Sequence, residues 1–243
     1  VTLLSGDTSL GTATADANGS FSITTGELAD DDYSLTVTAT DAAGNTSSAS
    51  TALALTIDTA APSTPSISTT TALTNDSTPD IAGTAEAGST VTLFSGDTSL
   101  GTATADANGD FSITSSQLAD NSYTLTVKAT DAAGNESEVS NELSIQIDAT
   151  APSQPSITTT TSITNIGIVT IDGFAEAGST VELFNGDTSL GTATADANGS
   201  FSITTDELAD NDYTLTVVAT DAAGNPSSAS TALALTIDTA APS

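Results

Sequence analysis

Hydrophobic and polar residues alternate along most of this chain with a period of two. In the longest such stretch Tyr123, Leu125, Val127 and Ala129 alternate with polar residues, many of them threonine. This pattern is typical of β-strands that bury one face, and threonine suits the outward positions of a strand. No stretch shows the 3.6-residue period of an amphipathic helix. We therefore expect an all-β protein.

Turn-forming residues divide these strands at short intervals. The turns are Ala87-Gly88, Gly96-Asp97, Asn108-Gly109, Asn121-Ser122 and Ala133-Gly134-Asn135. About seven short strands within about 90 residues predict an immunoglobulin-like β-sandwich. Tyr123, at the head of the sixth strand, is placed as in the tyrosine corner of such sandwiches. The chain has no cysteine and no tryptophan, which excludes the antibody subclass.

The chain is an internal repeat with a period of 90 residues. The segment Val1–Leu10 returns with one change at Val91–Leu100 and with three changes at Val181–Leu190. Proline-containing stretches at Thr59–Pro65 and Ala149–Pro155 mark the boundaries, because proline stiffens a short connection and does not continue a strand. We expect tandem sandwich domains in a linear array, cut from a longer repetitive chain. The expected division is a partial repeat lacking its first strands at 1–60, complete repeats at 61–150 and 151–240, and the start of a further linker at 241–243.

Three motifs carry a resemblance to a known family. They are Gly83–Val91, Leu118–Asn135 and Ile147–Pro152. Together they resemble the bacterial Ig-like repeats of giant surface adhesins of the RTX and biofilm-associated type, which leave the cell by type I secretion. The resemblance implies an extracellular, calcium-stiffened extender stalk on a bacterial cell surface, serving adhesion and biofilm formation. Its implied partners are neighbouring repeats and other copies of the same adhesin.

The composition removes most chemistries. The formal charge is −30, with 31 acidic residues against Lys128 alone, and the chain has no histidine, cysteine or methionine. A basic nucleic-acid interface, a Ser-His or Cys-His mechanism, and zinc, haem or iron–sulfur sites therefore lack their residues. No apolar run approaches the length of a membrane span. We expect no enzyme and no direct membrane insertion, and only metals that bind oxygen, calcium or magnesium, remain.

The acidic residues of different loops are expected to meet between domains. If the strands run alternately up and down, the loops after the second, fourth and sixth strands share the pole reached by the preceding linker. Carboxylates that meet there repel by about 4 kcal/mol per pair at about 4 Å and an effective dielectric constant near 20. Calcium, which accepts six to eight oxygens in flexible geometry, relieves that repulsion better than magnesium. The predicted calcium ligands are Asp58, Glu86, Asp106 and Asp131 at the first junction, Asp148, Glu176, Asp196 and Asp221 at the second, and Asp238 at the next.

Several alternatives stay open at this point. Asp106 and Asp196 precede Ala-Asn-Gly, where an aspartate also stabilises a hairpin turn. The opposite pole, with Asp30, Asp97 and Asp120, fits either a solvated acidic face or a second ion site. For the whole chain, the alternatives to a stalk are an Ig-like module that recognises a glycan or host protein, and a self-assembling surface fibre. A further alternative is that the acidity is an adaptation to high salt, without calcium.

Overall fold

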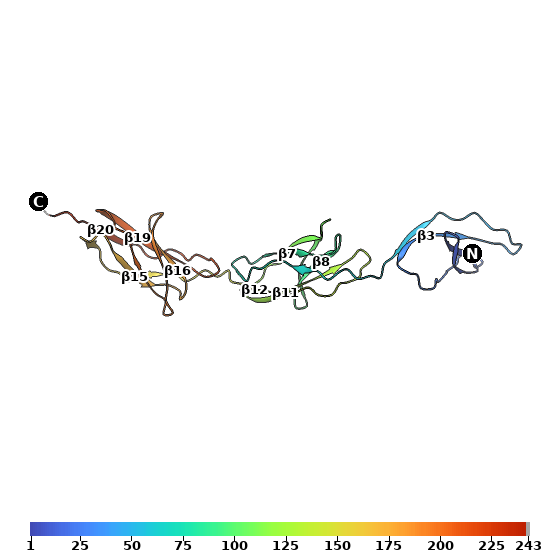
Figure 1. Cartoon of the computed structure of the whole chain (residues 1–243), viewed down its shortest axis with the longest axis horizontal. Helices are drawn as coiled ribbons and strands as arrows, with labels where there is room; N and C mark the ends of the chain where they lie inside the picture. Colours follow the sequence, from blue (N-terminus) through green and yellow to red (C-terminus); the bar gives the residue numbers. More distant parts are fainter. Residues whose placement is uncertain (242–243) are drawn as a thin grey trace.

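The chain folds into three β-units arranged end to end (Figure 1). The computed structural model describes residues 1–241, and these contain the strands β1 to β20 and no helix. The expected all-β class is therefore confirmed, and no helix able to cross a membrane occurs among the described residues. Of the linker predicted at 241–243, residues 242–243 lie outside this description.

The middle unit is a sandwich of two sheets. Its strands are β5 (Ser66–Ile67), β6 (Leu73–Thr74), β7 (Asp80–Thr84), β8 (Thr90–Ser95), β9 (Thr98–Thr104), β10 (Asp110–Thr114), β11 (Asn121–Thr130) and β12 (Leu143–Ile147). One sheet has the order β10-β7-β5 and the other β6-β12-β11-β8-β9. The first strand of the expected seven is split, because β5 pairs antiparallel with β7 while β6 pairs parallel with β12. The edge strand thus crosses from one sheet to the other.

The third unit repeats this architecture. Its strands are β13 (Ser156–Ile157), β14 (Ile163–Thr164), β15 (Thr170–Phe174), β16 (Thr180–Asn185), β17 (Thr188–Thr194), β18 (Ser200–Thr204), β19 (Asn211–Thr220) and β20 (Leu233–Ile237). Its sheets have the orders β13-β15-β18 and β14-β20-β19-β16-β17. Strand for strand, this is the order of the middle unit.

The first unit has one sheet in the residues described. Its strands β1 (Thr2–Ser5), β2 (Thr8–Thr12), β3 (Asp31–Thr38) and β4 (Leu53–Ile57) pair in the order β2-β1-β3-β4. Without a facing sheet its apolar side chains stay exposed, Leu53 at 64% against 8% for the equivalent Leu143. The two later units therefore hold the closed hydrophobic cores.

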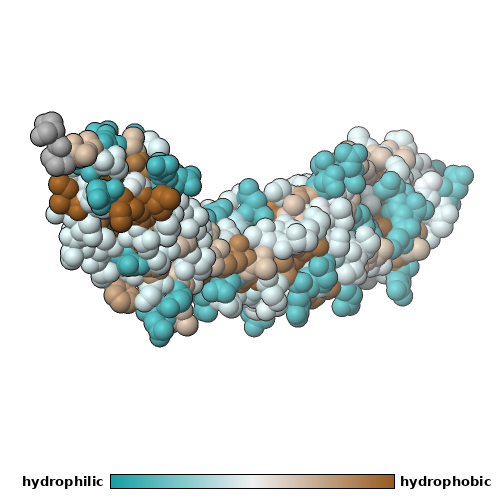
Figure 2. Space-filling view, turned by 60° about the vertical axis from the view of Figure 1, so that its left-hand side comes forward, coloured by the Kyte–Doolittle hydropathy of each residue, from teal (hydrophilic) through white to brown (hydrophobic). Residues whose placement is uncertain are grey.

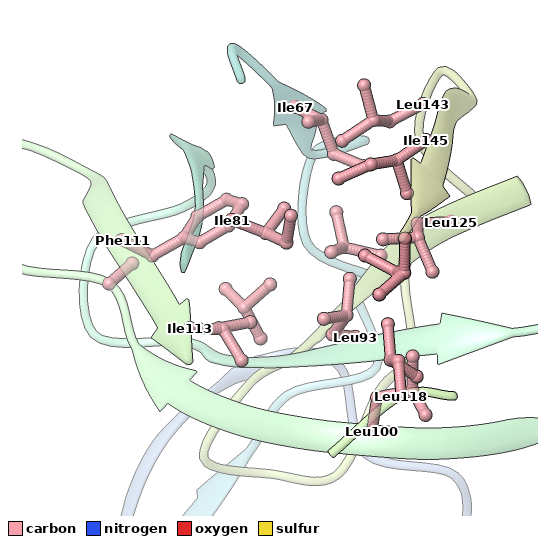
Figure 3. Packing of buried hydrophobic residues seen from close by; sticks show 14 residues of the cluster. Ile67, Ile81, Leu93, Leu100, Phe111, Ile113, Leu118, Leu125, Leu143 and Ile145 are labelled. Carbon is pink, nitrogen blue, oxygen red and sulfur yellow. The ribbon is translucent and has the colours of Figure 1, made fainter. Parts of the chain in front are cut away.

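The core of the middle unit lies between its two sheets (Figure 3). Ile81 and Ile113 face it from the smaller sheet, and Leu93 and Leu125 from the larger one, each at most 1% exposed. The tyrosine corner is present, since the Tyr123 hydroxyl donates to the carbonyl of Ala119 at 3.0 Å. This bond fixes the start of β11.

Candidate functional site

The three loops expected at one pole lie together beside the incoming linker. The N–H of Ala85, after β7, donates to the carbonyl of Gly109, in the loop before β10, at 2.8 Å. In the same region the N–H of Gly88 donates to the carbonyl of Ala105 at 3.0 Å. The third loop, after β11, reaches the linker itself. The up-and-down strand order therefore places these loops as the sequence predicted.

An asparagine in the third loop binds the linker backbone. The side-chain amide of Asn135 donates to the carbonyl of Asp58 at 3.0 Å. At the next junction the amide of Asn225 donates to the carbonyl of Asp148 at 2.7 Å, and Asn225 is only 7% exposed. The same contact thus joins both linkers to the unit that follows them.

The aspartate at the start of this loop holds the asparagine in position. One carboxylate oxygen of Asp131 accepts the N–H groups of Gly134 and Asn135, at 2.8 and 2.9 Å. The other accepts the Asn135 amide at 2.8 Å, so the amide bridges carboxylate and linker. Gly134 supplies the left-handed turn, at φ +96°, that a side chain would strain. The loop therefore holds the side-chain amide of Asn135 in one orientation, towards the linker.

These hydrogen bonds keep the loop carboxylates ionised. The side-chain bond from Asn135 is the main cause that lowers the pKa of Asp131 below its ordinary value. At Asp221 burial is the largest effect and acts upward, but the combined hydrogen bonds from Asn225 and the loop N–H groups outweigh it, so the pKa is lowered. The pKa of Asp106 is lowered chiefly by the backbone N–H of Asp110.

The predicted ligands of the first junction lie at one pole without forming a cluster. Glu86 accepts the N–H of linker residue Ser63 at 3.3 Å, and the Asp58 carboxylate accepts the N–H of Ala60 at 3.0 Å. Asp106 accepts N–H groups within its own turn. No group of three or more carboxylates within residues 1–241 is arranged to hold a metal ion. The expected convergence of four carboxylates is thus absent from the structure, and each of them accepts backbone N–H groups.

The second junction and the last linker repeat these contacts. Asp196 accepts two N–H groups of its turn, and Asp148 and Asp238 accept the N–H groups of Thr150 and Ala240. Glu176 is exposed. The predicted metal ligands at both junctions are all oxygen atoms, which are the ligands that calcium prefers. Coordination of calcium by these nine residues remains a prediction.

A contact that the sequence did not reveal holds each linker from the other side. Asp120 accepts the backbone N–H of Ala149 at 2.8 Å and the hydroxyl of Thr150. The pKa of Asp120 is lowered, first by the Thr150 hydroxyl. The same bond joins Asp30 to Thr59 and Asp210 to Thr239. The recurrence of Leu-Ala-Asp every 90 residues was the available signal, but those aspartates were assigned to a solvated face or a second ion site.

The middle and third units also come close to each other beside the linker. A Cβ placed on Gly224, in the loop after β19, would lie 3.7 Å from the side-chain nitrogen of Asn75 in the middle unit. At the end of the linker, the Gln154 amide donates to the carbonyl of Ala229 at 2.6 Å, within the third unit. The linker is therefore held at its start by Asp120 and Asn225 and at its end by Gln154, and the two units approach each other beside it.

Comparison with known proteins places these units in a family. A family model described as a bacterial Ig-like domain matches residues 1–59 and 60–149, and one described as a bacterial Ig domain matches residues 151–235. Chitinase A1 of Niallia circulans is 38% identical over 125 residues, which cover 47% of this chain and 17% of the chitinase. The matched region is thus a small part of that relative's length.

Two solved structures are among those that match the chain. Fibronectin(III)-like modules of Clostridium thermocellum CbhA match 71% of this chain and 93% of theirs, with 16% identity and a TM-score of 0.47. The BSP domain of a biofilm associated protein matches 73% of this chain and 30% of its own, with 26% identity and a TM-score of 0.30.

Proposed function

The chain belongs to the bacterial Ig-like domain family, and on this premise we propose that it is a structural extender segment of a bacterial cell-surface adhesin. In this role it holds an adhesive tip away from the cell, outside the cell, after export by type I secretion. The observation that carries the proposal is the two-sided grip on each linker, by an aspartate of the preceding unit and an asparagine of the following one. Hydrogen bonds to the linker from both units restrict their relative motion, which favours a stiff stalk over a flexible chain of domains.

The near-identity of the units supports spacing over recognition. Residues 6–25 and 186–205 have the same sequence. Units that recognise different ligands diverge in their loops, whereas units that supply length need only fold and connect. The excess of acidic residues fits the same role, because net charge keeps a long fibre soluble and discourages collapse.

Small-angle scattering of the full chain tests the stalk. Replacing Asn135 and Asn225 together by alanine removes both linker contacts. We expect a shorter maximum dimension and a broader distribution of shapes than in the wild type. Asn45→Ala is the matched control, since within residues 1–241 the Asn45 amide donates to the Asp41 carboxylate and to no linker carbonyl. Equal scattering curves for the double variant and the wild type contradict an amide-held stalk.

We further propose that calcium stiffens the junctions, with Asp58, Glu86, Asp106 and Asp131 as the oxygen donors of the first one. Bound calcium supplies positive charge at a pole where these side chains are acidic and loop carbonyls are at hand. The lowered pKa values support this, because Asp106 and Asp131 are ionised and ready to bind a cation. Extracellular modules bind calcium with dissociation constants of about 10⁻⁴–10⁻³ M. The sites would then fill only after export.

Chelation separates this mechanism from the hydrogen-bonded stalk. Thermal unfolding and scattering are compared in millimolar calcium and in excess EGTA, at one ionic strength. We expect a higher melting temperature and a longer particle in calcium, and a smaller calcium effect in Asp131→Asn. Curves that coincide in both buffers contradict the calcium mechanism. Such curves do not bear on the hydrogen-bonded stalk, which the Asn135 and Asn225 variants test separately.

A second candidate function is favoured by one feature of the middle unit. The outer face of its larger sheet carries a groove of about 440 Å³, lined by Phe94, Val139 and the 3.1 Å ion pair of Lys128 with Glu136. An apolar surface beside paired donors and acceptors suits a neutral saccharide. The first and third units have Thr38 and Val218 in place of Lys128. Binding of a glycan that Phe94→Ala abolishes would favour a recognition module.

A further inference from the structure

The third unit carries an exposed apolar patch that the middle unit does not have. Ile163, Ile166 and Ile168 are 65%, 61% and 54% exposed. They lie on β14 and on the segment leading to β15, beside a small groove floored by Ile171 and Leu235. Figure 2 shows hydrophobic surface gathered at the end of the molecule that carries the C-terminus. We call the three isoleucines the isoleucine patch.

The equivalent segment of the middle unit is more polar. Position for position it has Leu73, Asp76 and Thr78, and Leu73 is half-buried. Asp76 accepts the backbone N–H of Thr78 at 2.8 Å, closing a polar turn. The fold therefore accommodates polar residues here, and burial within the unit does not require the isoleucines. Exposed clusters of large apolar side chains in soluble proteins mark contact surfaces.

The middle junction shows what this segment faces. Asn75, next to Asp76, lies close to Gly224 in the loop after β19 of the following unit. In the third unit Asn165 and Ile166 occupy the places of Asn75 and Asp76. Asp210 holds Thr239 at the same end, just as Asp120 holds the second linker. The isoleucine patch therefore lies in the segment equivalent to the one that, in the middle unit, lies beside the loop of the following unit.

The expected docking partner has a matching surface. The loop tips that enter the junctions read Ala132-Ala133-Gly134 and Ala222-Ala223-Gly224, and Ala132 and Ala222 are exposed. A small apolar tip fits an isoleucine surface without leaving buried polar groups unpaired.

We propose that the isoleucine patch is a docking surface for an Ig-like unit placed after residue 241, which buries Ile166 and Ile168 under its Ala-Ala-Gly loop tip. This junction adds an apolar contact to the polar linker bonds of Asp210 and Asp238, whereas the two preceding junctions have polar residues in that place. The chain thus contains two kinds of joint, and the difference is set by the residues between β14 and β15.

The inference rests on the proposed array, and spin-label distances test it on an extended chain. A copy of residues 154–241 is appended after Ser243, so that the added unit follows the natural linker spacing. The chain has no cysteine, so introduced cysteines are the only labelling sites. Ser189→Cys in the third unit and in the copy reports the new junction. Ser99→Cys with Ser189→Cys reports the middle junction as an internal reference, since both serines are exposed.

The variant Ile166→Asp with Ile168→Thr installs the middle unit's own residues, so it is expected to fold. We expect a narrow distance distribution at the new junction in the wild-type sequence, and loss of that narrow peak in the variant. Phe174→Thr is the matched control, because Phe174 is another exposed apolar residue, on the neighbouring strand β15, and the middle unit has Thr84 in its place. It should leave the distribution unchanged.

Two results overturn the inference. One is a distribution at the new junction that is the same with and without the isoleucines. The other is concentration-dependent dimerisation of the unextended chain that Ile166→Asp abolishes, which assigns the patch to a second copy. A broad distribution at the middle junction instead contradicts the proposed rigid array, and is separable because it is measured by the other label pair.

Discussion

The polar contacts at the junctions depend on carboxylates that must stay ionised. Asp131 receives three hydrogen bonds, and each of them favours the charged form over the protonated one. Protonation of the Asp131 carboxylate would also place an O–H donor opposite the N–H donor of the Asn135 amide. Loss of this single charge therefore releases the asparagine that grips the linker.

Stability of the middle unit should fall in acid because of Asp131. Its pKa is lower in the folded protein than its ordinary value, so its contribution is present above that ordinary value and is lost as the pH falls through the folded pKa. We expect urea midpoints that decline below about pH 4, since unperturbed aspartate titrates near 3.9. Urea denaturation followed at a series of pH values measures this.

Asp131→Asn separates this effect from the general charge of the chain. Acid also reduces the net negative charge, which on its own relieves repulsion. The variant should therefore be less stable at neutral pH and show a smaller decline in acid. If wild type and variant decline in parallel, the acid sensitivity comes from other groups.

The other side of each linker makes a separate prediction. Asp120→Ala removes the bonds to the Ala149 N–H and the Thr150 hydroxyl. Because Asp120 is exposed, we expect little change in melting temperature but a broader distance distribution between labels at Ser99 and Ser189. Asp97→Ala is the control, since it removes one exposed carboxylate from the same unit. Equal broadening in both variants would show that charge, and not the linker bond, matters.

The sequence predicted where the functional loops lie better than what their side chains bind. Repetition and alternation placed Asp131 and Glu86 at one pole, but the expectation that carboxylates would face one another was wrong for this structure. Asp106 and Asp131 accept N–H groups from within a few residues, and Glu86 accepts the N–H of the linker residue Ser63. Asn135 and Asp120 were missed because an amide or carboxylate that bonds to a backbone group of another segment leaves no composition or charge signature.

At the scale of elements, the sandwich closes through one tight approach between strands. A Cβ on Gly83 would lie 2.0 Å from the Ser66 carbonyl oxygen and 2.6 Å from the Phe111 ring. Gly173 is equally enclosed, by Ser156 and Phe201. The pairing of β5 with β7, and of β13 with β15, thus requires a residue without a side chain at this position.

Gly83→Ala should destabilise the middle unit selectively. Overpacking of this kind costs about 1–3 kcal/mol, and more where backbone atoms must move, as here. Thermal unfolding should show one transition shifted down while that of the third unit keeps its temperature. Gly26→Ala is the control, because nothing lies within 4 Å of the added carbon. A Gly83→Ala chain that melts like the control would mean that β5 is not paired in solution.

The same strands show which parts of the fold the sequence left undetermined. The alternation of Tyr123, Leu125 and Val127 predicted β11 and its buried face, and the core confirms it. The crossing of the edge strand was not predicted, since β5 and β6 have two residues each. Two residues are too few to show a period, and their partners lie far away in the sequence.

At the scale of the whole molecule, negative charge is almost uncompensated. The formal charge is −30, and within residues 1–241 the pair of Lys128 with Glu136 is the one ion pair. Repulsion between units is screened over about 8–10 Å at physiological ionic strength. Charge therefore acts mainly within a unit and across a junction, where salt and a bound divalent cation have different effects.

This difference allows the acidic composition to be interpreted by experiment. If the acidic residues only adapt the chain to high salt, melting temperature should rise with sodium chloride and ignore both calcium and chelator. If calcium binds at the junctions, millimolar calcium should raise the melting temperature more than sodium chloride at the same ionic strength, and more than magnesium, which demands stricter octahedral geometry.

Because the predicted ligands at each junction are all oxygen atoms, we expect the calcium response. Calorimetry of the full chain measures it. Asp58→Asn with Asp148→Asn should reduce it while leaving the response to sodium chloride intact, because screening acts on all the remaining carboxylates. A double variant that responds to calcium as the wild type does would remove the linker aspartates from the binding site.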